Sequence, residues 1–136
     1  MKRLFASLLL LVTLAAGCAE PPPYNNLDNV QLQDMLDKGT QIYDVRRPEE
    51  WQQTGVIKGS KLLTFIDANG QLRPDFLSRF TSEVGKDDPV ILICRTGNRT
   101  DALARYLVEK LGYTNVYNVR DGIMLWLRQN KPVEKI

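Results

Sequence analysis

Histidine is absent from this chain of 136 residues, and only two cysteines occur, Cys18 and Cys94. Without an imidazole there is no Cys–His or Ser–His catalytic pair, and zinc loses its commonest nitrogen ligand. The two cysteines do not form a closely spaced pair of the kind used in redox motifs. The sequence therefore predicts no metal site and no organic cofactor.

No hydrophobic run is long enough to span a bilayer comfortably. The longest, residues 4 to 16, follows the basic pair Lys2 and Arg3 and ends in small residues before Cys18. A basic start, a short apolar centre and small residues are typical of a secretory signal peptide, which we place at residues 1 to 17. The alternative is a membrane-anchoring helix.

The end of that segment resembles the lipobox of bacterial lipoproteins, with the sequence Leu14-Ala15-Ala16-Gly17-Cys18. The resemblance implies that Cys18 is the lipidated first residue of the mature protein and anchors it to the membrane. Ala15 stands where Leu is usual, which leaves ordinary secretion open. Because Ala19 rather than Asp follows Cys18, the resemblance points to the bacterial cell envelope, on the periplasmic side of the outer membrane.

Three consecutive prolines, residues 21 to 23, lie within the segment 18 to 25 and favour an extended polyproline II tether. The rest of the chain, residues 26 to 136, is long enough for one domain with its own core. Charge of one sign is not in excess, because removing Lys2 and Arg3 lowers the 18 basic residues to 16, equal to the 16 acidic ones. We therefore expect no nucleic-acid partner.

Hydrophobic patterning predicts strands that alternate with helices. The expected strands are residues 40 to 45, 61 to 65, 89 to 93 and 116 to 119. The expected helices are residues 28 to 38, a short one from 48 through 51, then 74 to 80, 98 to 111 and 122 to 128. This alternation indicates an α/β fold with a mainly parallel central sheet and helices on both faces.

Cys94 follows residues 89 to 93, a continuous apolar run typical of a strand buried on both faces. Sites in such sheets form beyond the carboxyl ends of the strands. The helix start behind Cys94, together with Arg95 and Arg99, favours a thiolate, and Gly97 allows the backbone amides to curl around an anion. An inert core cysteine is the alternative, but the arginines and glycine that follow are typical of a surface.

The loop from Cys94 to Thr100 resembles the active-site loop of rhodanese domains, in which a cysteine is followed by a small polar residue, Gly, Arg, and Ser or Thr. Residues 43 to 60 resemble the first signature of that family, and residues 118 to 126 resemble its C-terminal signature. The resemblance covers about residues 26 to 130. Val56 stands where the family often has His, and Asp121 where it often has the first Gly of a pair.

The resemblance implies a sulfurtransferase. Cys94 takes sulfur from a small anionic donor such as thiosulfate, becomes a persulfide, and passes the sulfur to cyanide, a thiol or a protein thiol partner. The residues expected to hold the persulfide are Arg95, Thr96, Gly97, Asn98 and Arg99. Arg95 binds the donor or is merely solvated, Arg99 braces the loop, and Thr100 caps the helix. Asp44 and Arg46 form a structural ion pair or join the rim of the site.

Three other functions remain open. Tyrosine and dual-specificity phosphatases place five residues between Cys and Arg, whereas four separate Cys94 from Arg99. A non-catalytic rhodanese-like binding or regulatory module is the stronger alternative, although such modules commonly lose the cysteine. A thiol redox protein would need a second cysteine within the domain.

Overall fold

The computed structural model describes residues 17 to 136. The predicted signal peptide, apart from Gly17, lies outside the described residues. Among the helices of the described part, none combines the length and the apolar character needed to cross a membrane.

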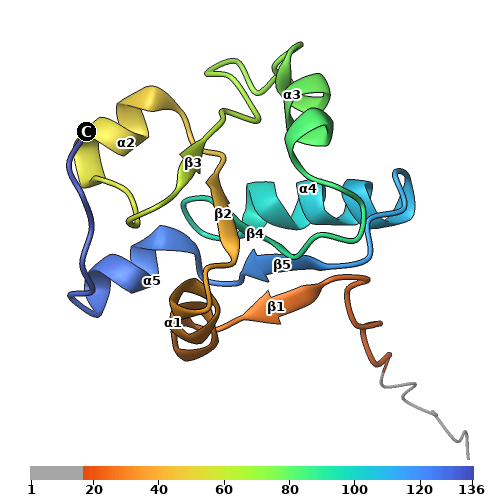
Figure 1. Ribbon diagram of the computed structural model, residues 1–136, viewed down its shortest axis with the longest axis horizontal. Coiled ribbons are helices and arrows are strands. Elements are labelled where there is room, and N and C mark those ends of the chain that lie inside the picture. Colours follow the sequence, from red (N-terminus) through yellow and green to blue (C-terminus); the bar gives the residue numbers. More distant parts are fainter. Residues whose placement is uncertain (1–16) are drawn as a thin grey trace, which may run out of the picture.

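A five-stranded sheet forms the centre of the fold, and all its neighbouring strands are parallel (Figure 1). The order across the sheet is β1-β5-β4-β2-β3, so that β4 is the middle strand. The strands are β1 (Asn25–Leu27), β2 (Gln41–Asp44), β3 (Lys61–Leu62), β4 (Val90–Ile93) and β5 (Val116–Val119). The parallel α/β sheet predicted from the sequence is confirmed.

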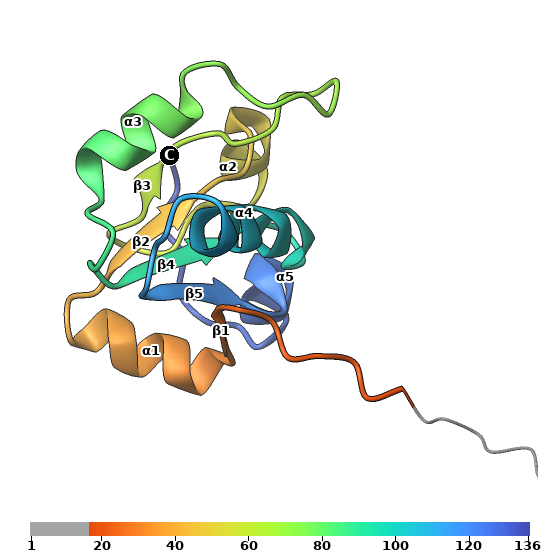
Figure 2. The same cartoon turned by 90° about the vertical axis from the view of Figure 1, so that its right-hand side faces the viewer.

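Helices cover both faces of the sheet. They are α1 (Asn29–Asp37), α2 (Pro48–Thr54), α3 (Phe76–Glu83), α4 (Asn98–Glu109) and α5 (Gly122–Arg128). Val90, Leu92 and Cys94 belong to one core cluster with side chains of α3 and α4, whereas Ile91 and Ile93 belong to a second cluster with α1 and α5. In Figure 2, α4 lies above the sheet and α1 below it. Alternate residues of β4 thus fill opposite cores, as expected for a strand buried on both faces.

The start of the packed chain differs from the prediction. Tyr24 is only 9% exposed and its hydroxyl hydrogen-bonds Asp101 of α4, while β1 begins at Asn25, which pairs with Tyr117 of β5. The packed domain therefore begins at Tyr24, and the predicted tether through residue 25 is two residues too long. A three-residue strand with two exposed residues has neither an apolar run nor an alternation to reveal it.

The starts or ends of α1, α3 and β3 can also be compared with the prediction from the sequence. The capping box predicted at Asp28 and Gln31 is present at the start of α1. Helix α3 lies two to three residues later than predicted, at Phe76–Glu83. The expected strand of residues 61 to 65 is regular only over Lys61–Leu62, although Phe65 N still donates to Val45 O at 3.1 Å. The extended chain after β3 therefore continues alongside the end of β2.

The C-terminal segment returns to the start of the chain after α2 (Figure 1). Val56 N donates to Glu134 O at 2.9 Å and Glu134 N donates to Val56 O at 2.7 Å. Trp126 of α5 donates from Nε1 to Pro132 O at 2.9 Å. Val56, at the position where a histidine is frequent, is 6% exposed and thus acts as a packed residue held by a backbone bridge.

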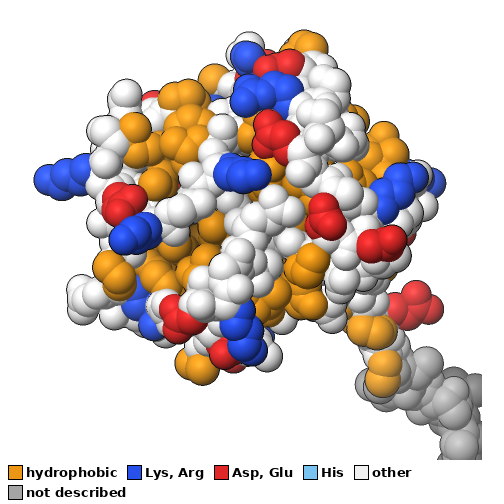
Figure 3. Space-filling model, in the orientation of Figure 1, with side chains coloured by type: hydrophobic (Ala, Val, Ile, Leu, Met, Phe, Trp, Pro, Cys, Tyr) orange, Lys and Arg blue, Asp and Glu red, His pale blue; other side chains and the backbone are white. Residues whose placement is uncertain are grey.

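Charged side chains of both signs are interspersed over the face shown in Figure 3, which has no extended region of one sign. Several charged side chains of the domain form ion pairs one helical turn apart, including Lys38 with Asp34 at 2.6 Å and Arg105 with Asp101 at 3.0 Å. Such exposed pairs contribute little to stability, so the fold depends mainly on its two apolar cores.

Candidate active site around Cys94

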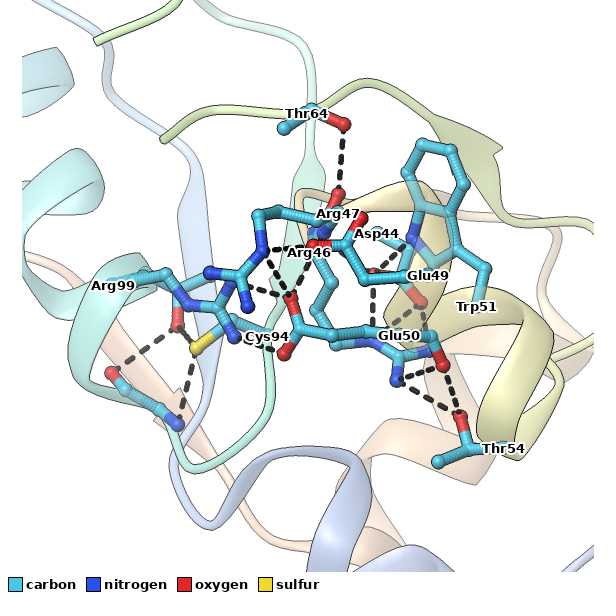
Figure 4. A network of polar contacts seen from close by, with 12 residues as sticks. Asp44, Arg46, Arg47, Glu49, Glu50, Trp51, Thr54, Thr64, Cys94 and Arg99 are labelled. Carbon is cyan, nitrogen blue, oxygen red and sulfur yellow. Dashed lines mark hydrogen bonds and ion pairs between the residues drawn. The ribbon is translucent and has the colours of Figure 1, made fainter. Parts of the chain in front are cut away.

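Cys94 lies directly after β4, and it is 1% exposed. Its Sγ atom accepts a hydrogen bond from the backbone N–H of Gly97 at 3.2 Å and lies 3.3 Å from the hydroxyl of Thr100. Figure 4 shows the sulfur between the chain that follows β4 and the first turn of α4. The chain therefore curls around the sulfur atom and leaves only a narrow approach to it.

Two backbone carbonyls at the start of this loop accept hydrogen bonds from α5. Ile123 N donates to Cys94 O at 2.9 Å, and Met124 N donates to Arg95 O at 3.2 Å. With the carbonyls turned toward α5, the loop amides are left for another acceptor. Within residues 17 to 136, no protein acceptor is recorded for the backbone N–H groups of Arg95, Thr96, Asn98, Arg99 and Thr100. Consecutive unpaired amides at a helix start form a cradle for an anion.

Two glycines allow the loop to take this shape. Gly97 has a φ of +92°, and a Cβ atom there would lie 2.0 Å from Arg120 O. Gly122 has a φ of +61°, and its Cβ would lie 2.2 Å from Arg95 O. The close approach of α5 to the loop therefore requires Gly122, whereas Asp121 before it is half-buried and pairs with Arg120 at 3.1 Å. The family often has two consecutive glycines here. This chain has Asp121 in the first position and retains Gly122 in the second, where the packing requires a glycine.

Thr100 does not cap α4, so that expectation was wrong. The N-cap residue is Gly97, and the Thr100 hydroxyl is fully buried, where it donates to Asn118 Oδ1 at 2.5 Å. Asn118 of β5 also donates from Nδ2 to Gly97 O at 3.4 Å. Asn118 was not predicted as a site residue, although a polar side chain in a buried strand is an informative signal. Thr100 and Asn118 form a buried polar layer behind the sulfur of Cys94.

The Arg99 side chain pairs with Glu50 of α2. Its Nη1 and Nη2 atoms donate to the two carboxylate oxygens of Glu50 at 2.8 and 2.7 Å. Burial alone would raise the pKa of Glu50, but the hydrogen bonds and charges of Arg99 and Arg47 outweigh it and lower this pKa to about 2. The same pair raises the pKa of Arg99. A two-point ion pair thus ties the Cys94 loop to α2, and Glu50 was missed because this partner lies 49 residues away.

Asp44 and Arg46 form the buried ion pair that was one of their two expected roles (Figure 4). Their side chains are 0% and 1% exposed, and Arg46 Nη2 lies 2.8 Å from Asp44 Oδ2. Arg46 also donates to Gly55 O at 3.0 Å, and Trp51 Nε1 donates to Asp44 Oδ1 at 3.1 Å. With these partners, the pair organises the chain between β2 and α2.

Arg95, in contrast, is exposed and belongs to no ion pair recorded within the described residues. Its side chain borders an open pocket of about 430 Å³ together with Thr96, Asp121, Met124 and Arg128. Asn98 is also exposed. Cys18 is exposed in the segment before β1 and is not part of this arrangement. The structure therefore brings together the sequence-predicted residues from Cys94 to Thr100, with Glu50 and Asn118 added.

Comparison with known proteins places this geometry in a family. The sequence model of the rhodanese-like domain family matches residues 28 to 129 of this chain. The thiosulfate sulfurtransferase GlpE of Pseudoalteromonas translucida is 32% identical over 104 residues, which cover 76% of this chain and 89% of that protein. A sulfurtransferase of Allochromatium vinosum is 31% identical over 111 residues, which cover 80% and 94% of the two chains.

Among solved structures, a rhodanese-like domain protein from Staphylococcus aureus is similar, with 25% identity and a TM-score of 0.59 over 75% of this chain and 90% of that one. An uncharacterised protein of Rickettsia conorii, 34% identical over 71% of this chain and 81% of its own, shows that some relatives have no named activity. The matched model covers most of the sequence and includes Cys94 and its loop. The chain belongs to the rhodanese-like domain family.

Proposed function

We propose that this protein is a sulfurtransferase that carries sulfane sulfur as a persulfide on Cys94. The observation that carries the proposal is the environment of the sulfur, which accepts the backbone amide of Gly97 at 3.2 Å and begins a loop whose amides at Arg95, Thr96, Asn98 and Arg99 have no protein acceptor within residues 17 to 136. Such amides stabilise negative charge both on a thiolate and on the terminal sulfur of a persulfide. The chain supplies this stabilisation without histidine, which it lacks.

The reaction proceeds in two half-reactions that balance without an added oxidant or reductant. The Cys94 thiolate attacks the outer sulfur of thiosulfate, the sulfur–sulfur bond of the donor breaks, and sulfite leaves with the bonding electron pair. The product is the Cys94 persulfide. A thiolate or cyanide then attacks the terminal sulfur, and the Cys94 thiolate is released as the leaving group.

Loop size favours sulfur over phosphate as the group that is carried. Four residues separate Cys94 from Arg99, and the Arg99 guanidinium is held by both oxygens of Glu50. Because both terminal nitrogens of Arg99 already donate to Glu50, this arginine does not bind the oxygens of a phosphoryl group. The loop therefore relies on backbone donors, which suit a single sulfur atom.

Intact-mass measurement after incubation with thiosulfate tests the proposal. We expect the protein to gain the mass of one sulfur atom, to lose it on addition of cyanide, and to form thiocyanate over repeated cycles. Cys94→Ser should gain no sulfur. A wild-type protein that stays unmodified, or a serine variant that still gains sulfur, would contradict the mechanism and favour a non-catalytic binding role.

We also propose that Cys18 carries a lipid anchor and that the domain works on the periplasmic side of a bacterial outer membrane. The support is the sequence around Cys18, together with its exposed position before the packed domain. Mass analysis of the amino-terminal peptide of the protein isolated from membranes should show acyl chains on Cys18. A mature protein that begins at another residue without acyl chains would overturn this part.

A further inference from the structure

A series of polar side chains connects the first strand of the sheet with the sulfur of Cys94. It runs from Asn26 of β1 through Asn118 of β5 to Thr100 of α4, and we call these three residues the Asn–Thr network. Thr100, Asn118 and Cys94 are 0%, 2% and 1% exposed, whereas Asn26 lies at the surface. Because the inner members are buried, their hydrogen bonds have to be shared among the protein atoms within reach.

Thr100 has one hydroxyl proton and three acceptors near it. Its Oγ1 atom lies 2.5 Å from Asn118 Oδ1, 3.2 Å from Gly97 O and 3.3 Å from Cys94 Sγ. The shortest of these contacts is the one to Asn118. Between Cys94 and Thr100 either atom is able to be the donor. A protonated sulfur therefore donates to Thr100 while Thr100 donates to Asn118.

The direction of the Asn118 side-chain amide is set by its other contacts. Its Nδ2 atom lies 3.4 Å from Gly97 O and 3.3 Å from Asn26 Oδ1. Because a backbone carbonyl only accepts hydrogen bonds, the nitrogen of Asn118 faces Gly97 and its oxygen faces Thr100. The contact with Asn26 gives the same nitrogen a second acceptor and thereby strengthens Oδ1 as an acceptor for Thr100.

Negative charge on the sulfur changes which acceptor suits the Thr100 proton. A Cys94 thiolate has no proton to donate and accepts hydrogen bonds more strongly than a thiol. To donate to it, the hydroxyl has to turn away from Asn118 Oδ1, which then remains buried without this donor. Asn118 therefore favours the protonated sulfur, in opposition to the loop amides, which favour the thiolate.

We propose that Asn118, oriented by Asn26, is a positioning residue that restrains the reactivity of Cys94 by competing with its sulfur for the Thr100 proton. This proton stays on Thr100, and only its acceptor changes when Cys94 loses its own proton to the solvent. The inference rests on the proposed sulfurtransferase function and names two residues that regulate its nucleophile. Because Asn26 belongs to β1, the strand after the predicted tether contributes to the active site (Figure 1).

A double-mutant cycle tests the proposal. The four proteins are the wild type, Asn118→Leu, Thr100→Val and the double variant, and leucine has nearly the size of asparagine without its hydrogen-bonding groups. The Cys94 thiolate is measured without sulfur donor by its ultraviolet absorbance, at one pH at which the wild-type sulfur is mostly protonated. The spectrum of Cys94→Ser is subtracted to remove the tyrosines and Cys18. Persulfide formation with thiosulfate is then followed by intact mass at the same pH.

We expect Asn118→Leu to raise the thiolate absorbance about fivefold, which corresponds to one net hydrogen bond. The rate of persulfide formation should also rise, but less, because a more stable thiolate is a weaker nucleophile. Both gains should vanish in the Thr100→Val background, where no hydroxyl is left for Asn118 to hold. Damage to packing would lower the rate in both backgrounds, so a gain that depends on Thr100 distinguishes positioning from a structural role.

Asn26→Ala is a second test at an exposed position, and it remains informative if Asn118→Leu does not fold. It should raise the thiolate absorbance about twofold, because the Asn118 nitrogen then keeps only Gly97 O as an acceptor and its oxygen accepts less strongly. Asn25→Ala is the matched control. Asn25 is the neighbouring asparagine of β1, its side chain lies on the other face of the strand, and its replacement should leave the absorbance unchanged.

A folded Asn118→Leu protein with no more thiolate than the wild type would overturn the proposal, and so would a gain of equal size in the Thr100→Val background. Equal absorbance of Asn26→Ala and Asn25→Ala would overturn the role of β1. These outcomes are distinct from failure of the sulfurtransferase function, because the absorbance needs no sulfur donor. A wild type that forms no persulfide would overturn that function by itself. Urea unfolding of each variant shows whether the folded protein is being measured.

Discussion

In the proposed sulfurtransferase, the polar contacts of the Cys94 loop come mainly from backbone groups. The Gly97 amide contacts the sulfur, α5 holds the loop carbonyls, and Thr100 supplies the one side-chain contact recorded for the sulfur in the described chain. The consequence is that small changes in the loop backbone, or in Thr100, should alter reactivity.

Replacing Thr100 by Val should slow persulfide formation about tenfold, because the hydroxyl 3.3 Å from Sγ can no longer turn its proton from Asn118 to the thiolate. It should also cost about 1 to 3 kcal/mol of unfolding free energy, since the buried Asn118 loses its hydroxyl donor. Thr100→Ser keeps the hydroxyl and is the matched control. Stopped-flow rates with thiosulfate and urea unfolding measure the two effects, and equal rates for the Val and Ser variants would contradict the role of the hydroxyl.

Gly97→Ala should destabilise the protein more than Gly39→Ala, although both glycines have positive φ angles of +92° and +81°. A Cβ at Gly39 meets no atom within 4 Å, so that change costs about 1 kcal/mol from the backbone conformation alone. At Gly97 the clash with Arg120 O adds roughly 2 kcal/mol or more and displaces the loop. Urea unfolding compares the two variants, and only Gly97→Ala should lose persulfide formation.

At the residue scale, local sequence singled out Cys94 and its loop because the glycine, the arginines and the following helix are contiguous, and the roles of these residues stay predictions. It failed at Thr100, where a threonine in the first turn is a plausible cap but the cap position belongs to Gly97. It also missed Glu50 and Asn118, whose relevance depends on contacts made after folding. Long-range partners of this kind have no signature in a single sequence.

At the level of elements, the tie between α2 and α4 holds the Cys94 loop in place. Glu50 in the first turn of α2 accepts both hydrogen bonds from Arg99, and it also accepts the backbone N–H of Arg47 at 2.9 Å. One carboxylate thus orders the start of α2 and the start of α4 together. This contact connects the loop that follows Cys94 with the start of α2.

Glu50→Gln should lower the stability of the protein at neutral pH, and the difference from wild type should depend on pH. The folded-state pKa of Glu50, about 2, lies below its usual value of 4.5, so the carboxylate stabilises the fold fully above about pH 5. This contribution is lost as the pH falls from 4.5 through 2. Urea unfolding at several pH values should therefore show the two proteins converging near pH 2.

Glu49→Gln is the matched control for that experiment. Glu49 is the neighbouring residue, its side chain is 54% exposed, and its ion pair with Arg47 lies at the surface. Exposed pairs contribute little, so this variant should unfold nearly like the wild type at neutral pH. A large effect of Glu49→Gln, or a pH-independent effect of Glu50→Gln, would argue against the buried ion pair as the cause.

Element prediction succeeded where the pattern was strong and failed where tertiary contacts define the element. The apolar run of β4 and the capping box of α1 were identified from sequence, and α4 was placed within two residues at its end. Strand β1 was missed because its pairing with β5 brings together residues more than 90 positions apart. Helix α3 was shifted because Asp75 precedes it without a side-chain cap.

At the scale of the whole molecule, the edge strand β1 and the buried Tyr24 before it mark the first residues of the folded domain. Tyr24 and Leu27 are buried, at 9% and 5% exposure, whereas residues 17 to 21 are exposed. A protein that starts at Tyr24 should unfold at the same temperature as one that starts at Cys18. A protein that starts at Asp28 should lose about 3 kcal/mol or more, because two buried side chains and β1 are removed.

Thermal unfolding of these two truncations measures the prediction. Tyr24→Phe in the longer protein is a useful control, because it keeps the ring and removes the hydroxyl that bonds Asp101. It should cost less than the removal of β1. A similar unfolding temperature for both truncations would show that β1 adds little to the sheet.

Because β1 runs parallel to β4, the chain enters the sheet at the edge opposite to Cys94. Figure 1 shows the segment before β1 leaving the molecule at the far end from the start of α4. A group attached to this segment would thus lie on the opposite side of the sheet from the loop that follows Cys94. With the proposed lipid anchor on Cys18, the carboxyl ends of the strands would face away from the membrane, and reaction partners of Cys94 would approach from the solution.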